Sequence, residues 1–132
     1  MKKIYVAGDY SADNIIEGLQ NIGKGRMESV KLFRRGFAPF CPWWDASFCI
    51  DLPYADFDKD MFYNASMAWM EASDAVYVIS GVGKGGGVDK EIARAAKLGI
   101  PVFYNMDDLV NWSVEKVTTI NFMGEKYPLK KE

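Results

Sequence analysis

Residues 80–91 combine glycines, a lysine and a carboxylate in the order SGVGKGGGVDKE. An apolar run, 75–79, precedes this stretch, and a helical pattern, 88–98, follows it. Where a buried strand turns into a helix, free backbone N–H groups and the helix dipole converge and favour anionic ligands. The chain has no histidine. A carboxylate such as Glu91 is therefore the natural group for covalent or acid–base chemistry on a small molecule.

The glycine-rich turn is compatible with several kinds of site. Residues 81–86 match the G-x-G-x-x-G pattern of dinucleotide-binding proteins, but here the pattern follows the third expected strand rather than the first. No Ser or Thr follows Lys84, so the turn is not a P-loop. A flexible loop with ordinary glycines is the alternative to a cradle for a phosphate or a sugar. We favour the cradle, formed by Ser80, Lys84, Gly85, Gly86 and Gly87.

Glu91 is either an ordinary acid near the start of a helix or a nucleophile. Val88, Ile92 and Ala95 form the apolar stripe of that helix, and Glu91 lies three residues after Val88 and four before Ala95. We therefore expect its side chain to border the apolar face, with the helix dipole keeping the carboxylate ionised. Such a carboxylate can attack an anomeric carbon and hold a covalent glycosyl ester.

Other candidates for the site come from two further segments. Tyr5, on the first expected strand, is either a core aromatic residue or a phenol that orients Glu91. Trp43 and Trp44 either stack on a planar base or anchor their loop to the core. The loop after the first strand and the tryptophan loop add the remaining candidates, Gly8, Asp9, Tyr10 and Asp45.

Strand and helix patterns alternate along the chain, which predicts a parallel sheet. The expected strands are 3–8, 37–41, 74–79, 101–104 and 117–122. The expected helices are 13–22, 26–35, 61–72, 88–98 and a turn at 107–112, with a break at 23–25. Pro39 places the second strand at a sheet edge. We predict one flavodoxin-like, doubly wound α/β domain over 1–132, with strand order 2-1-3-4-5 and a polar tail at 123–132. Its ligand site is expected beyond the carboxyl ends of strands one and three.

The bulk composition excludes several classes of function. With 132 residues and a net charge of −2, the chain has the size of one domain and no basic surface for nucleic acid. Two cysteines without histidine do not predict a zinc site, and no cofactor is expected. No apolar run reaches the roughly 20 residues that span a bilayer, so no membrane partner is expected. Free thiols and the lack of a signal peptide indicate a cytoplasmic protein.

Several pieces of the chain, in their order and spacing, resemble the nucleoside 2-deoxyribosyltransferase-like superfamily, which includes nucleotide N-glycosidases. The resemblance is closest to its small phage and bacterial branch and covers roughly residues 3–112. The matching pieces are IYVAG at 4–8, GFAPFCP at 36–42, SMAWMEASDAV at 66–76, GVDKE at 87–91 and AAKLGIPV at 95–102.

The resemblance implies roles for individual residues. The glutamate that matches Glu91 is the nucleophile of this superfamily, and the tyrosine that matches Tyr5 contacts it. Gly87, four residues earlier, would let the substrate approach the backbone. Asn14 matches a recurring asparagine, and Asp108 or Asn111 would reach the site of a neighbouring subunit. The resemblance also implies a homo-oligomer.

Two positions differ from the pattern of the superfamily. Ser66 and Gly85 stand where many members have aspartates. We expect cleavage or transfer at the N-glycosidic bond of a (deoxy)nucleoside or nucleoside 5′-monophosphate, through a glycosyl ester on Glu91. The alternative is a nucleotide-binding module without turnover, which the two missing carboxylates favour.

Overall fold

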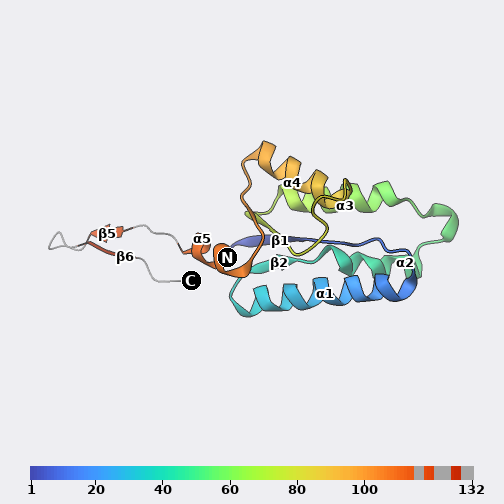
Figure 1. Ribbon diagram of the computed structural model, residues 1–132, viewed down its shortest axis with the longest axis horizontal. Helices are drawn as coiled ribbons and strands as arrows, with labels where there is room; N and C mark the ends of the chain where they lie inside the picture. The colour runs from blue at the N-terminus through green and yellow to red at the C-terminus, as the bar shows by residue number, and fades with distance from the viewer. Residues whose placement is uncertain (115–117, 121–125, 129–132) are drawn as a thin grey trace.

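Four parallel strands form the centre of the molecule (Figure 1), in a computed structural model that describes residues 1–114, 118–120 and 126–128. The strands are β1 (Lys3–Ala7), β2 (Ala38–Phe40), β3 (Ala75–Val78) and β4 (Val102–Phe103), in the order β2-β1-β3-β4. Pro39 lies on the edge strand β2, opposite Ile4 of β1, as its missing N–H predicted. The α/β class and the order of the first four strands are confirmed.

Helices cover both faces of the sheet, and the alternation along β1 divides the core between them (Figure 1). Ile4 and Val6 pack with α1 (Ile15–Arg34) and α5 (Met106–Ser113). Tyr5 and Ala7 point to the opposite face, against α3 (Lys59–Glu71) and α4 (Gly87–Leu98). Because β1 is buried on both faces, Tyr5 is held rigidly on the same side of the sheet as α3 and α4.

The segment between β2 and α3 folds into short helices. They are the 3-10 helix η1 (Pro42–Ser47), α2 (Phe48–Asp51) and the 3-10 turn η2 (Tyr54–Asp56). The sequence showed no clear period here, because no single regular element spans the segment. Its first part, η1, packs against α1 and the inner strand β1.

The fifth expected strand does not extend the parallel sheet. Residues Thr118–Ile120 form β5, which pairs antiparallel with β6 (Lys126–Pro128) in a separate two-stranded sheet. A short connection permits antiparallel pairing, whereas a parallel strand would need a longer crossover. Of the expected polar tail 123–132, residues 126–128 are β6. The remainder of this tail, like residues 117, 121 and 122 of the expected strand, lies outside the described residues.

The first helix is continuous, although the sequence predicted a break at 23–25. Glycine in a helix interior costs about 1 kcal/mol relative to alanine, and tertiary packing outweighs that cost here. Gly25 is buried, and a Cβ placed on it would lie 2.2 Å from Cε3 of Trp43. The missing side chain therefore lets the Trp43 ring lie directly against the α1 backbone.

Most of the apolar residues at helical spacing in α1 face outward, although Ile22 is partly buried against the core. The buried positions are instead Asn21, Gly25, Ser29 and Leu32, and Ser29 donates a hydrogen bond to the Gly25 carbonyl at 2.7 Å. The exposed stripe consists of Ile15, Ile16, Leu19, Met27, Val30 and Phe33. Contiguous apolar surfaces of this kind are typical of contact sites. No helix in the described part of the chain is long and apolar enough to cross a membrane.

We expect Gly25→Ala to destabilise the protein by about 1–3 kcal/mol, because the new methyl group would overlap the Trp43 ring. The matched control is Gly18→Ala in the same helix, where a Cβ meets nothing within 4 Å. That change should stabilise by about 0.4–1 kcal/mol. Urea denaturation of wild type and the two variants measures both effects. A Gly25→Ala variant as stable as wild type would contradict the close contact between Gly25 and the Trp43 ring.

Candidate active site at the carboxyl edge of the sheet

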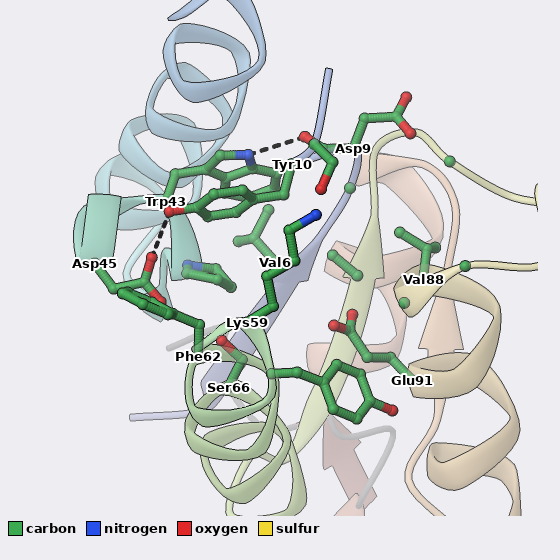
Figure 2. Close-up of a pocket in the computed structure, with 18 of the residues that line it drawn as sticks. Val6, Asp9, Tyr10, Trp43, Asp45, Lys59, Phe62, Ser66, Val88 and Glu91 are labelled. Carbon is green, nitrogen blue, oxygen red and sulfur yellow. Dashed lines mark hydrogen bonds between the residues drawn. The ribbon is translucent and has the colours of Figure 1, made fainter. Parts of the chain in front are cut away.

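A cavity of about 690 Å³ lies beyond the carboxyl ends of β1 and β3, at the edge where the sequence predicted a ligand site (Figure 2). Its volume lies within the range of small-molecule sites. Four segments form its walls: the loop after β1, the segment that begins with η1, the first two turns of α3, and the glycine turn with the start of α4. Predicted residues that line it are Tyr5, Gly8, Asp9, Tyr10, Trp43, Asp45, Ser66, Lys84, Gly86, Gly87 and Glu91.

Glu91 projects from α4 onto the cavity wall, and only 8% of its surface is exposed. The Tyr5 hydroxyl donates a hydrogen bond to Glu91 Oε1 at 3.1 Å, across 86 residues of sequence. Burial raises the pKa of Glu91 to about 7, and the hydrogen bond from Tyr5 opposes that rise. The expectation that the helix dipole keeps this carboxylate ionised is therefore corrected, because desolvation outweighs the stabilising interactions. Burial and the nearby Glu91 charge likewise raise the pKa of Tyr5.

Asp45 is the second buried carboxylate among the described residues, with 8% of its surface exposed. It projects from η1 and accepts a hydrogen bond from the Tyr10 hydroxyl at 2.6 Å (Figure 2). Burial raises the pKa of Asp45, while the Tyr10 hydrogen bond favours the ionised form and opposes the shift. Two of the carboxylates that line the cavity are thus buried, and each accepts a hydrogen bond from a tyrosine.

Trp43 connects η1 to the loop after β1. Its indole Nε1 donates a hydrogen bond to the Asp9 carbonyl at 2.9 Å, and its ring lies parallel to that of Tyr10, with 6.5 Å between centroids (Figure 2). Trp44 behaves differently, because half of its surface is exposed and its ring packs edge-on against Phe48. Trp44 does not line the cavity, so the prediction that it covers a bound base is not supported within the single chain.

The glycine turn is organised by Asp89. Its carboxylate accepts hydrogen bonds from the backbone N–H of Gly83 at 2.9 Å and of Gly85 at 2.6 Å, and these bonds lower the pKa of Asp89. Gly83 and Gly85 have positive φ angles, 83° and 68°, which glycine tolerates best. The predicted contact of Gly85 with a ligand is thus corrected, because its N–H already has a partner and it does not line the cavity.

The donors that remain open to the cavity lie at the start of α4. Gly86 is the N-cap of this helix, and no side chain of the described residues caps it. Gly86, Gly87 and Val88 line the cavity. Unpaired N–H groups in a first helical turn attract anions, so this wall has the positive character that the sequence assigned to the whole turn.

Two polar contacts hold the loop after β1 against the glycine turn. Lys84 Nζ lies 3.1 Å from the Asp9 carboxylate, and both groups are accessible to solvent. The Asp9 backbone N–H donates to Ser80 Oγ at 2.8 Å. A Cβ on Gly8 would lie 2.7 Å from Ile79 Cγ1, so only glycine fits between the ends of the two strands. Through its hydrogen bond with the Asp9 N–H, Ser80 fixes the loop after β1. Ser80 does not line the cavity, so its predicted contact with a ligand is corrected.

Three further candidates lie away from the cavity. Asn14 caps α1, and its side chain accepts a hydrogen bond from the Glu17 backbone N–H at 2.9 Å. Asp108 and Asn111 lie on α5, and Asp108 pairs with Asn105 at 2.8 Å. The prediction that Asn14 contacts the ligand is corrected for this chain. The expectation that Asp108 or Asn111 serves a neighbouring subunit stays a prediction.

Sequence reasoning missed the wall formed by α3. Of its residues only Ser66 was predicted; Lys59, Phe62 and Tyr63 also line the cavity, together with Phe57 just before the helix. Figure 2 shows the Lys59 side chain extending from α3 into the cavity. Their spacing of three, four and seven residues marks one helix face. The sequence instead drew attention to the opposite face, whose residues Met61, Ala65, Ala68 and Ala72 are exposed.

The raised pKa of Glu91 has a consequence for stability. Because the folded protein binds this proton more tightly than the unfolded chain, stability falls as pH rises from 4.5 to about 7. Glu91→Gln removes the titrating group. The variant should therefore gain up to about 3 kcal/mol over wild type at pH 8, and much less at pH 5.

Urea denaturation at the two pH values measures this difference. Tyr5→Phe removes the hydrogen bond that opposes the shift, so it should move the upper end of the pH window to higher pH. An equal difference between Glu91→Gln and wild type at pH 5 and pH 8 would contradict a buried, titrating Glu91.

Comparisons with known proteins place this geometry in context. No protein-family model matches the sequence, and no curated protein does either. Among solved structures, the chain is similar to a 2-deoxyribosyltransferase from the psychrotolerant bacterium Bacillus psychrosaccharolyticus, described as a biocatalyst for nucleoside synthesis. The TM-score is 0.53 at 19% sequence identity, over 83% of this chain and 80% of that chain. The chain therefore has the α/β fold of a 2-deoxyribosyltransferase, the class of enzyme that its sequence motifs resemble.

Proposed function

We propose that this protein cleaves the N-glycosidic bond of a (deoxy)nucleoside or, preferably, of its 5′-monophosphate, and passes the sugar to water or to a second base. The observation that carries the proposal is the buried Glu91 carboxylate on a cavity wall, hydrogen-bonded to Tyr5. A carboxylate is kept in such a place at a cost in stability, which argues for a chemical role. The fold shared with a 2-deoxyribosyltransferase supports the same reaction class.

The reaction would use Glu91 as a nucleophile. The ionised carboxylate attacks C1′ of the sugar, the bond from C1′ to the base nitrogen breaks, and its electron pair leaves with the base. A glycosyl ester on Glu91 remains. Water in hydrolysis, or a second base in transfer, then attacks C1′, the bond from C1′ to the Glu91 oxygen breaks, and the proton that the acceptor loses balances the one that the departed base gains. Tyr5 donates its hydrogen bond to Oε1, which leaves the other carboxylate oxygen free for the attack.

The walls of the cavity suit the two ends of a nucleotide. The aromatic rings of Tyr10 and Phe62 provide apolar faces for a planar base. On the side of Glu91, the open N-terminus of α4 and the ammonium group of Lys84 would attract a 5′-phosphate, and the ammonium group of Lys59 extends into the cavity from α3 (Figure 2). The base would therefore lie toward η1, and the 5′ end would lie toward the glycine turn.

Ser66 would replace the aspartate that many members of the superfamily have at this position. It lies on the cavity-facing side of α3, where its hydroxyl interacts with that of Tyr5 and opposes the rise of the Tyr5 pKa. Ser66 would thus help to orient the phenol that in turn orients Glu91.

Release of free base from a panel of nucleosides and their 5′-monophosphates tests the proposal. We expect Glu91→Ala to lower release by at least about 10³-fold, because the nucleophile is lost. For wild type, kcat/KM should rise as pH increases through about 7, where Glu91 loses its proton, by roughly 100-fold between pH 5 and pH 8. Undiminished cleavage by Glu91→Ala would overturn the assignment.

The alternative function, nucleotide binding without turnover, gives a different result in the same panel. Calorimetry would detect tight binding of a nucleotide, and no free base would appear with either water or a second base as acceptor. The positions of Ser66 and Gly85, without the carboxylates of many relatives, are what favour this alternative.

We also propose that the protein forms a homo-oligomer, as the resemblance implies. The exposed apolar stripe on α1 supports this proposal, because burying it against a second copy would remove it from water. Sedimentation should give a mass at least twice that of the 14.9 kDa chain. A monomer at concentrations well above those of the activity assay would contradict it.

A further inference from the structure

The carboxylate of Asp45 has no part in the steps assigned to Glu91. It lies in the same cavity, and its Oδ1 accepts the hydrogen bond from the Tyr10 hydroxyl at 2.6 Å. Among the described residues, none donates a hydrogen bond to its second oxygen, Oδ2. An ionised carboxylate accepts at both oxygens, and leaving one of them without a donor in a buried place destabilises the ionised form. Because Asp45 lines the cavity, a bound ligand can supply this donor in place of water.

The position of Asp45 indicates which part of a ligand would supply that donor. In the view of Figure 2, Asp45 and Glu91 lie on opposite sides of the cavity, with Phe62 and Ser66 of α3 between them. A nucleoside whose C1′ meets Glu91 extends its base away from α4. The edge of the base that is farthest from the sugar would then reach η1, where Asp45 lies.

We propose that Asp45 selects bases that carry an exocyclic amino group, by accepting a hydrogen bond from that group through Oδ2. This inference rests on the proposed function, because Glu91 sets the direction in which the base points. The substituent farthest from the glycosidic nitrogen stands at C4 of a pyrimidine, and in a purine the substituent at C6 is about as far as any other and distinguishes adenine from hypoxanthine. An amino group at this place donates, whereas a keto oxygen turns its lone pairs toward the carboxylate and is repelled.

Tyr10 acts as the positioning residue for this contact. Its hydroxyl already donates to Oδ1 of Asp45, which leaves Oδ2 as the oxygen without a protein donor, and its ring is held parallel to that of the buried Trp43. The orientation of the carboxylate is therefore set by a chain of contacts from the protein core. An oriented acceptor distinguishes amino from keto substituents better than one that can rotate.

Binding to the Glu91→Gln protein, which would not consume the ligand, tests the selection. Calorimetry compares cytosine with uracil and adenine with hypoxanthine, each pair as deoxynucleosides and as their 5′-monophosphates. We expect the amino member of a pair to bind roughly 10- to 100-fold more tightly, which corresponds to one hydrogen bond to a charged group. Equal binding, or tighter binding of the keto member, would overturn the proposal.

Variants in the same background identify the residue responsible. Asp45→Asn should bring the amino-to-keto ratio close to one or invert it, because the amide can donate to a keto oxygen. The matched control is Asp56→Asn, at an exposed position of η2 that does not line the cavity, which should keep the ratio. A ratio unchanged in Asp45→Asn would overturn the proposal. If Asp45→Asn fails to fold, Tyr10→Phe takes its place in the test. We expect Tyr10→Phe to lower the amino-to-keto binding ratio at least about 3-fold, and an unchanged ratio would overturn the proposal.

Base release by wild type, measured on the same pairs, separates this inference from the proposed function. Release from amino and keto members at equal kcat/KM would overturn the role of Asp45 and leave the reaction standing. A strong amino preference in binding without release would support Asp45 and contradict the reaction. The lack of both binding and release for every compound would overturn the two together.

Discussion

The arrangement of the cavity depends on the packing of one indole ring, that of Trp43. Its ring lies against the bare backbone of α1 at Gly25 and reaches the end of β1 at Gly8. Its Nε1 donates to the Asp9 carbonyl, which fixes the loop that follows β1. A side chain at either glycine would displace the ring, and with it the wall that carries Tyr10. The geometry of the base-facing wall thus follows from close packing, since protein interiors leave no slack for an added methyl group.

The opposite wall depends on electrostatics. Glu91 is held in a desolvated place by Tyr5, and burial raises its pKa to about 7 instead of leaving it at the usual value for a glutamate. An acid in that range is partly ionised at neutral pH, and its ionised form is poorly solvated, which suits a nucleophile. Asp89 contributes by occupying the N–H groups of the glycine turn, so that positive character is confined to the start of α4.

Much of the fold could be predicted because the patterns were local. The buried strand β1, the edge position of β2 at Pro39 and the end of α4 at Gly99, with φ of 74°, each follow from residue types in a short window. The errors arose where tertiary contacts outweighed local preference. Gly25 reads as a helix break but provides space for Trp43, and the apolar stripe of α1 reads as core but is exposed in the single chain.

The sequence by itself determined the α/β class and the edge at which the cavity lies, because strand order places the ends of β1 and β3 side by side. For Tyr5 the residues left two interpretations open, the resemblance favoured a contact with Glu91, and the structure contains that hydrogen bond. Only the tertiary structure decided which other residues meet there. It turned Lys59 and Phe62 of α3 into the cavity, left Trp44 outside it, and buried Asp45 beside Tyr10. The physical reason is that the sequence of a helix shows its period and that of an irregular segment shows none. In both cases, packing against distant residues decides which side chains face the cavity.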